Sequence, residues 1–175
     1  MTTVIVMGVS GVGKSVVAKA LVESTGWTLA EGDDFHPPAN VEKMKAGTPL
    51  DDADRWPWLR SIAAWIGEQE RAGHSSVITC SALKRGYRDL LREGHPSVRF
   101  CQLDASTGVL QSRMEARREH YMPPPLLHSQ LRTLQSLEGD EPGGRVNAEG
   151  DLHTVLRRVL HLLAGHNGPA AEAAS

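Results

Sequence analysis

Residues 4–21 read VIVMGVSGVGKSVVAKAL, and they contain the most informative structural pattern of the chain. Val4 to Met7 form a short continuous apolar run, which is typical of a strand buried on both faces of a parallel sheet. A glycine-rich turn follows, and apolar residues then recur at helical spacing from about Lys14 to Glu23. The pattern predicts a strand, a tight turn and a helix, which is the first unit of an α/β domain.

The turn Gly8–Ser15 matches the pattern GxxxxGK(S/T) at every position. Its glycines allow the backbone N–H groups to wrap a phosphate, at the positive end of the following helix. We expect Lys14 to reach the β- and γ-phosphates of ATP and the Ser15 hydroxyl to bind Mg²⁺. A chance glycine turn is disfavoured because both flanks are also correct. The residues expected to contact the nucleotide are Gly8, Ser10, Gly11, Val12, Gly13, Lys14, Ser15 and Val16.

The rest of the chain alternates strand and helix patterns. This alternation predicts a parallel five-stranded sheet flanked by helices, the three-layer α/β/α sandwich of the P-loop NTPases. Ligands bind such sheets at the carboxyl ends of the strands. Further strands are expected at Trp27–Ala30, Ser76–Cys80, Val98–Leu103 and, with little hydrophobic length, Arg145–Asn147. Helices are expected at Asn40–Lys45, from a cap at Asp52 or Asp54 to about Gln69, and at Leu83–Arg92, Thr107–Arg118, Leu126–Leu137 and Leu152–Leu163.

The domain organisation is predicted to be simple. We expect a single domain over residues 1–164 and a flexible tail over 165–175, which is small, polar and rich in Ala and Gly. Pro123–Pro125 should exclude regular helix, and a mobile lid is expected over about 116–126.

Net charge, apolar runs and cysteines bear on the partners and the location of the protein. A net charge of −2 gives no argument for a nucleic-acid or membrane partner, and no apolar run is long enough for a membrane span. Cys80 and Cys101 each end an apolar run, so we expect two buried free thiols in a cytoplasmic protein.

Polar residues after the second predicted strand suggest an acceptor site. A carboxylate at Asp33 or Asp34 could accept the proton of an attacking hydroxyl or hold Mg²⁺ through water. The alternative is a solvated acidic turn. His36 is adjacent, and it is equally compatible with an ordinary surface or capping histidine.

Two basic clusters complete the candidate site. Lys84, Arg85 and Arg88 follow the third strand, and the four-residue spacing of Lys84 and Arg88 would let one helix face hold a carboxylate. Arg113 and Arg117 precede the proline run, from which they could stabilise charge on a transferred phosphoryl group. A solvated charged helix is the alternative for each cluster.

From about Val4 to Leu163 the chain resembles the P-loop gluconokinases, relatives of the shikimate and nucleoside-monophosphate kinases. The resemblance is carried by GVSGVGKS from Gly8, GDDFHPPANVEKMKAGTPLDDADRWPWL from Gly32, CSALKRGYRDLLR from Cys80 and SRMEARREHYMPPPLLHSQLRTLQSLE from Ser112. It implies transfer of the γ-phosphate of ATP to the 6-hydroxyl of D-gluconate, in an enzyme that needs Mg²⁺ and is often a homodimer.

The resemblance also implies a role for each cluster. Lys14, Asp33 and Arg117 would act in catalysis, with Asp33 orienting or deprotonating the hydroxyl and Arg113 beside Arg117 in the lid. Arg55 lies in a run that the family places over the acceptor site, although an ion pair with Asp51 or Asp52 is an alternative. The residues expected to bind gluconate are Asp33, His36, Arg55, Lys84, Arg85 and Arg88.

Two other functions remain open at this point. A kinase for another small acid, such as shikimate, would share the same ATP half-site. A nucleotide-binding regulatory protein that transfers nothing would keep the P-loop alone, since folds outlive functions.

Overall fold

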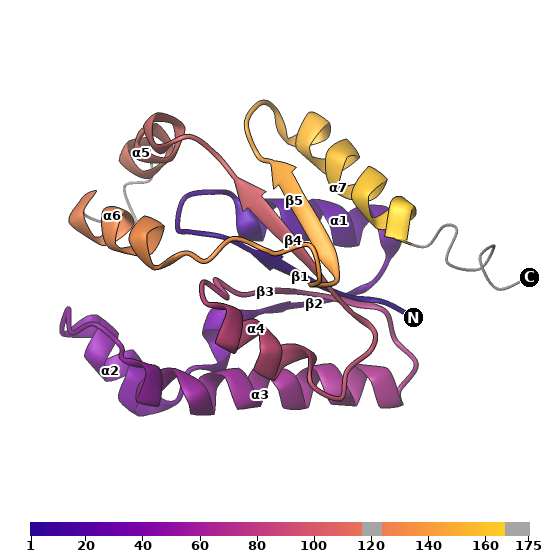
Figure 1. Ribbon diagram of the computed structural model, residues 1–175, viewed down its shortest axis with the longest axis horizontal. Coiled ribbons are helices and arrows are strands. Elements are labelled where there is room, and N and C mark those ends of the chain that lie inside the picture. The colour runs from indigo at the N-terminus through magenta and orange to yellow at the C-terminus, as the bar shows by residue number, and fades with distance from the viewer. Residues whose placement is uncertain (117–123, 167–175) are drawn as a thin grey trace, which may run out of the picture.

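The computed structural model describes residues 1–116 and 124–166. Within these residues a parallel five-stranded sheet of order β2-β3-β1-β4-β5 lies between two layers of helices (Figure 1). The strands are β1 Thr3–Met7, β2 Thr28–Glu31, β3 Ser76–Thr79, β4 Val98–Asp104 and β5 Gly143–Asn147. The helices are α1 Lys14–Thr25, the 3₁₀ turn η1 Gly32–Phe35, α2 Pro38–Lys45, α3 Asp52–Arg71, α4 Arg85–Arg92, α5 Thr107–Ala116, α6 Pro124–Thr133 and α7 Leu152–His166. The predicted sandwich is confirmed.

The central strand β1 explains the two-sided core. Its side chains alternate between the faces of the sheet, so Val4 and Val6 pack under α1 and α7 while Ile5 and Met7 pack against α3 and α4. All four side chains are fully buried. A strand covered on both faces needs apolar residues at every position, which is why the run carries no alternation.

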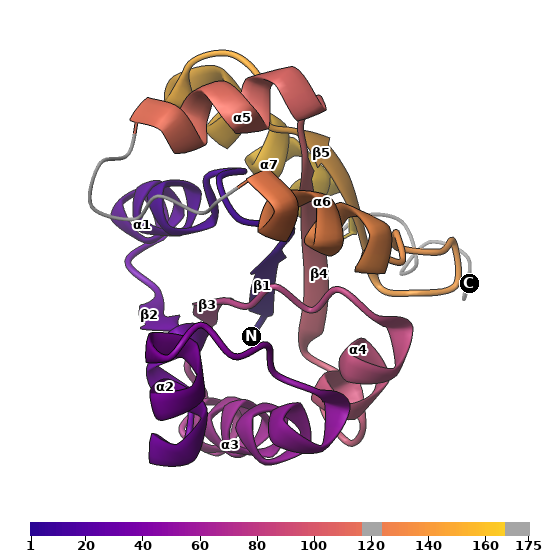
Figure 2. The same cartoon turned by 90° about the vertical axis from the view of Figure 1, so that its left-hand side faces the viewer.

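The strands present their carboxyl ends to one side of the molecule. Helices α2, α5 and α6 lie beyond that edge, and Figure 2 shows them around the ends of the strands. The P-loop follows β1, η1 follows β2, and the turn at Ala82 follows β3. The fold therefore gathers the predicted site segments at one edge of the sheet.

Three local predictions need correction. Helix α6 begins at Pro124, inside the proline run that was expected to exclude helix. The N–H groups in the first turn of a helix have no intrahelical partner, so a proline there loses no hydrogen bond by lacking its N–H. Helix α3 is capped by Asp51 rather than Asp52 or Asp54, and Asp54 returns the bond in a capping box. Strand β5 starts at Gly143, where a Cβ would lie 1.9 Å from the Phe100 carbonyl oxygen, so glycine and not hydrophobic length permits the pairing.

The predicted lid and tail fall largely on residues 117–123 and 167–175, outside the described residues. Helix α7 runs to His166, two residues into the predicted tail. Among the residues that are described, no helix is both long and apolar enough to cross a membrane.

Candidate active site

The Gly8–Ser15 loop has the backbone that its glycines permit. Gly8, Gly11 and Gly13 have φ of +143°, +84° and +103°, which side-chain-bearing residues rarely adopt. A Cβ on Gly8 would also lie 2.9 Å from the Leu103 carbonyl oxygen of β4. Because α1 begins at Lys14, within the last residues of this segment, the glycine-rich turn opens onto the positive end of a helix. The arrangement is an anion-binding cradle.

The Val9–Ser10 peptide group is held from two directions. Lys14 Nζ donates to the carbonyl oxygens of Gly8, at 2.9 Å, and of Val9, at 3.1 Å. On the other side of the same peptide, the Ser10 N–H donates to Gln130 Oε1 of α6 at 2.8 Å. The side chain of Gln130 therefore fixes the part of the loop that also receives the Lys14 ammonium. Gln130 was not among the predicted site residues, because it is 120 residues from Ser10 in the chain and no local pattern relates the two.

Ser15 contacts a carboxylate that was also not among the predicted site residues. Glu31, the last residue of β2, accepts hydrogen bonds from Ser15 Oγ at 3.0 Å and from Thr79 Oγ1 at 2.5 Å. The close approach requires Gly32, where a Cβ would lie 2.1 Å from the Thr79 carbonyl oxygen. Two hydroxyls around one carboxylate form an oxygen-rich set of the kind that Mg²⁺ prefers. The signal available in the sequence was an acidic residue at the very end of a strand.

Beside the loop lies a cavity of about 350 Å³. Arg113 of α5 borders it, donating to the carbonyl oxygens of Val12, at 3.0 Å, and Ala148, at 2.6 Å. Arg113 thus joins the P-loop to the segment after β5. The partner expected for it, Arg117, lies outside the described residues. The cavity is mainly apolar, with Val12, Val16, Val17, Ala148, Leu152 and Val155 in its walls.

The η1 turn presents Asp33 to solvent. Its side chain is 95% exposed, whereas that of His36, three residues on, is only 5% exposed. The His36 ring stacks on Trp58 with 4.3 Å between centroids, and Trp58 Nε1 donates to the Gly32 carbonyl at 2.7 Å. Trp58 therefore supports the turn that carries Asp33, and the predicted pair of Asp33 and His36 is brought together.

Next to this turn, the start of α3 meets the start of α4. Arg55 donates to the Tyr87 hydroxyl at 2.9 Å, Tyr87 donates to Asp52 in a short hydrogen bond, and Lys84 Nζ lies 3.1 Å from Asp52 Oδ1. The hydrogen bond from Tyr87, followed by that from Lys84, lowers the pKa of Asp52. Arg55 and Lys84 are thus brought together on one side of the site, around an ionised Asp52. Arg55 Nη1 also lies 4.0 Å from Asp52 Oδ1, so the ion pair given above as the alternative for Arg55 is formed at long range.

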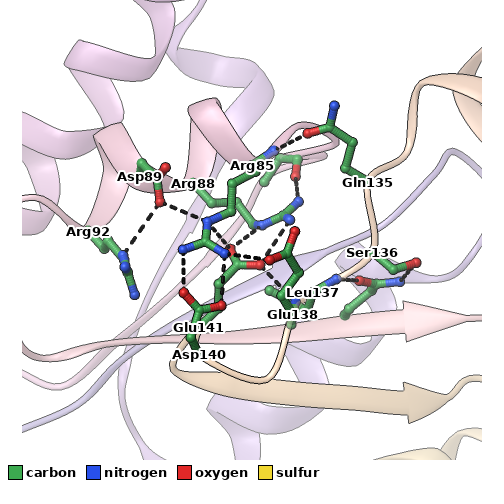
Figure 3. A network of polar contacts seen from close by, with 12 residues as sticks. Arg85, Arg88, Asp89, Arg92, Gln135, Ser136, Leu137, Glu138, Asp140 and Glu141 are labelled. Carbon is green, nitrogen blue, oxygen red and sulfur yellow. Dashed lines mark hydrogen bonds and ion pairs between the residues drawn. The ribbon is translucent and has the colours of Figure 1, made fainter.

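The structure separates Arg85 and Arg88 from Lys84. Arg88 is fully buried, where it donates to Glu141 at 2.7 and 3.1 Å and to the Ala82 carbonyl at 2.9 Å. Figure 3 shows Arg85 directed to the same loop between α6 and β5, where it contacts Glu138 and Asp140. This arrangement contradicts a direct carboxylate contact by Arg88. The assumed shared helix face fails because Lys84 precedes α4 with extended backbone.

Arg88 instead supports the turn after β3. Ala82 has a φ of +45°, an uncommon backbone conformation for a residue with a side chain. Arg88 holds its carbonyl oxygen, and the neighbouring Ser81 carbonyl accepts the N–H of Gly8 at 3.3 Å. The buried arginine thereby anchors a turn that contacts the entrance of the P-loop.

Comparison with known proteins identifies the family. A family model described as an AAA domain matches residues 4–137. A curated gluconokinase from Gluconobacter oxydans is 51% identical over 156 residues, covering 89% of this chain and 88% of that protein.

Two solved structures share both the fold and much of the sequence. A gluconokinase from Sinorhizobium meliloti superposes with a TM-score of 0.83 at 45% identity, covering 94% of this chain and 92% of the other. A sugar kinase from Janibacter sp. gives a TM-score of 0.87 at 49% identity, covering 94% and 95%. From its sequence identity and its fold, the chain belongs to the gluconokinase family of P-loop kinases.

Proposed function

We propose that this protein transfers the γ-phosphate of ATP to the 6-hydroxyl of D-gluconate, giving 6-phospho-D-gluconate and ADP. The observation that carries the proposal is the contact between Ser15 of the P-loop and Glu31, two residues before Asp33, in a member of the gluconokinase family. The contact supports the proposal because it links the P-loop to the segment that carries the exposed carboxylate of Asp33. Neither another acid kinase nor a non-catalytic protein is favoured by a specific feature of the site.

The ATP half of the site is supported by the loop and the neighbouring cavity. The N–H groups of Gly8–Ser15 would hold the phosphates, and the apolar cavity beside Val12 and Ala148 would take the adenine. Arg113, already bonded to both residues, would lie between base and phosphates. Lys14 would reach the β- and γ-phosphates by exchanging the carbonyls of Gly8 and Val9 for phosphate oxygens.

The donor set around Glu31 fits Mg²⁺. The Ser15 hydroxyl would be a direct ligand, and Glu31 and Thr79 would hold the ion's water molecules. When bound, Mg²⁺ supplies positive charge that neutralises the β- and γ-phosphates.

The acceptor half would orient gluconate by its charged end. Arg55 and Lys84 are partly exposed cations around one carboxylate, Asp52, and so keep a net positive charge for the gluconate carboxylate. The opposite end of the polyol would then extend to Asp33, which is fully accessible. Holding both ends converts the transfer into a reaction between prepositioned groups.

The transfer step follows from these positions. The 6-hydroxyl oxygen attacks the γ-phosphorus as the bond to the bridging oxygen of ADP breaks, and the hydroxyl proton passes to Asp33. Lys14 and Arg113 offset the charge that develops on the phosphoryl oxygens. Arg117 would add to this, and its role stays a prediction, as do the closing lid, the homodimer and a cytoplasmic location.

The product identifies the reaction. We expect ³¹P and ¹³C NMR of the reaction mixture to show one phosphate ester, on carbon 6 of gluconate. D33N should lower kcat on the order of 100-fold or more while the Kd for ATP changes little, because only the proton acceptor is lost. An ester at another carbon would contradict the 6-hydroxyl as the acceptor. An unchanged kcat for D33N would contradict the role given to Asp33.

A further inference from the structure

The His36 ring is held rigidly beside Asp33. It stacks on Trp58 at an interplanar angle of 12°, and its side chain is only 5% exposed. Trp58 itself donates a hydrogen bond to the Gly32 carbonyl, so the His36 ring is packed on a residue that is attached to the turn carrying Asp33. A histidine packed in this way presents only one ring edge to the site.

The amide of Asn40 determines which ring nitrogen carries the proton. Asn40 Nδ2 lies 2.9 Å from the Asp54 carbonyl oxygen, which only accepts, so this atom is the amide nitrogen and not the oxygen. The same Nδ2 lies 3.2 Å from His36 Nδ1. Since an amide nitrogen only donates, Nδ1 must accept with its lone pair, and the neutral ring carries its hydrogen on Nε2. Asn40 is 3% exposed, which gives the pair no competition from bulk water.

The protonated nitrogen faces the carboxylate assigned to the acceptor hydroxyl. His36 Nε2 lies 3.9 Å from Asp33 Oδ1, too far for a direct hydrogen bond. Two hydrogen bonds of about 2.8 Å that meet at one oxygen atom span this distance easily. A hydroxyl group satisfies both sides, because it can accept from His36 and donate to Asp33.

The surroundings also keep the ring neutral. The charged groups that act on it are Asp33 and Arg55, and its other neighbours are Trp58 and Asn40. Burial lowers the pKa of His36, the Asp33 carboxylate opposes this, and Arg55 lowers it further. Protonation at Nδ1 would in addition set two donors against each other at Asn40.

We propose that His36 donates from Nε2–H to the hydroxyl that receives the phosphoryl group, and that Asn40 is a positioning residue that fixes this tautomer. The inference rests on the proposed function, because it takes Asp33 as the acceptor of the hydroxyl proton. During transfer the hydroxyl proton goes to Asp33, the new bond to phosphorus forms as the bond to ADP breaks, and His36 keeps its own proton. His36 thus orients a lone pair and takes no part in proton transfer.

Two substitutions at position 36 separate the donor from the packing. The amide nitrogen of glutamine reaches the place of Nε2, whereas that of asparagine reaches only the place of Nδ1. We expect H36N to lower kcat about 30- to 100-fold with little change in the KM for ATP. The kcat of H36Q should be at least about tenfold higher than that of H36N. H74N, at an exposed histidine, is the matched control and should behave as the unsubstituted enzyme. Equal losses in H36N and H36Q, or no loss in H36N, would overturn the proposal.

The tautomer can be measured without any turnover. In protein labelled with ¹⁵N-histidine, we expect His36 to show a protonated Nε2 and an unprotonated Nδ1, with H36Q identifying its signals among the eight histidines. N40D replaces the donor by an acceptor, so the ring hydrogen should move from Nε2 to Nδ1. Because Nε2 then no longer donates to the hydroxyl, kcat should fall at least about tenfold. A protonated Nδ1 in the unsubstituted protein would overturn the inference while leaving the gluconate reaction intact. Absence of gluconate phosphorylation with the expected tautomer would instead overturn the proposed function, and with it the hydroxyl contact.

Discussion

Arg88 of α4 and Glu141, in the loop before β5, form a two-point ion pair, at 2.7 and 3.1 Å, in which both side chains are completely buried. The pair joins segments 53 residues apart and supports the turn at Ala82. Burial alone would raise the pKa of Glu141, yet the hydrogen bonds from Arg88 and from the Glu138 N–H leave it below its ordinary value of 4.5. Glu141 therefore stays ionised in the folded protein.

Breaking this pair should destabilise the fold strongly. R88M or E141Q should each lower the free energy of unfolding by about 3–5 kcal/mol at neutral pH, because one buried polar group loses its partner. The double variant R88M/E141L should recover most of the loss. Urea unfolding measures this, with D140N in the exposed Arg85 pair as a control worth about 1 kcal/mol or less. A cost for E141Q as small as that of D140N would contradict the role given to the pair.

Glu31 should control the response to Mg²⁺. E31Q should raise the Mg²⁺ concentration for half-maximal activity about 10- to 100-fold, since a carboxylate behind a metal ligand orients and charges the site. T79V should have a smaller effect, because it removes one hydroxyl and leaves the charge. Titration of activity with Mg²⁺ at fixed ATP distinguishes these variants, and an unchanged titration in E31Q would show that the carboxylate is unrelated to the metal.

Gln130 should matter for the nucleotide although it lies on α6. Q130L leaves the Ser10 N–H without its acceptor and should raise the KM for ATP a few-fold. Q130E keeps an acceptor but adds negative charge beside the phosphates, so its KM for ATP should rise more, on the order of tenfold or above. S129A, at an exposed neighbour on the same helix, is the control. Equal effects of Q130L and Q130E would place Gln130 away from the phosphates.

The two cysteines should be unreactive toward thiol reagents in the folded protein. Burial raises the pKa of the Cys80 and Cys101 thiols to about 12, and both are free and buried, as the sequence predicted. At pH 8 neither should react with a thiol reagent such as DTNB on the timescale of an exposed cysteine, because the thiolate is the reactive form. Both should react once guanidinium unfolds the chain. Rapid modification of the native protein would contradict the burial.

The sequence was most informative where structure is local. The P-loop, the buried strand before it and the alternation of strands and helices are patterns over a few residues, and they predicted the parallel sheet and its flanking helices. Gly32 illustrates the limit. Its necessity comes from the Thr79 carbonyl of a neighbouring strand, and no local pattern contains that contact.

Residues whose role depends on distant partners were misjudged or missed. Arg88 was placed on the substrate because helical spacing relates it to Lys84, whereas Glu141 draws it into the core. Gln130 and Asn40 matter because they contact Ser10 and His36. The sequence alone does not show which group an amide side chain will bond. Charge and spacing can therefore suggest candidate residues, but the partner of each side chain depends on the three-dimensional structure.

The most direct test of the proposed function is acceptor-dependent release of ADP. A coupled assay with Mg·ATP would compare gluconate, shikimate, glycerate and no acceptor, with K14A as the inactive control. We predict rapid ADP release with gluconate alone and almost none without an acceptor. Binding of ATP with no acceptor-dependent release of ADP, or release with another acid but not with gluconate, would contradict the proposed function.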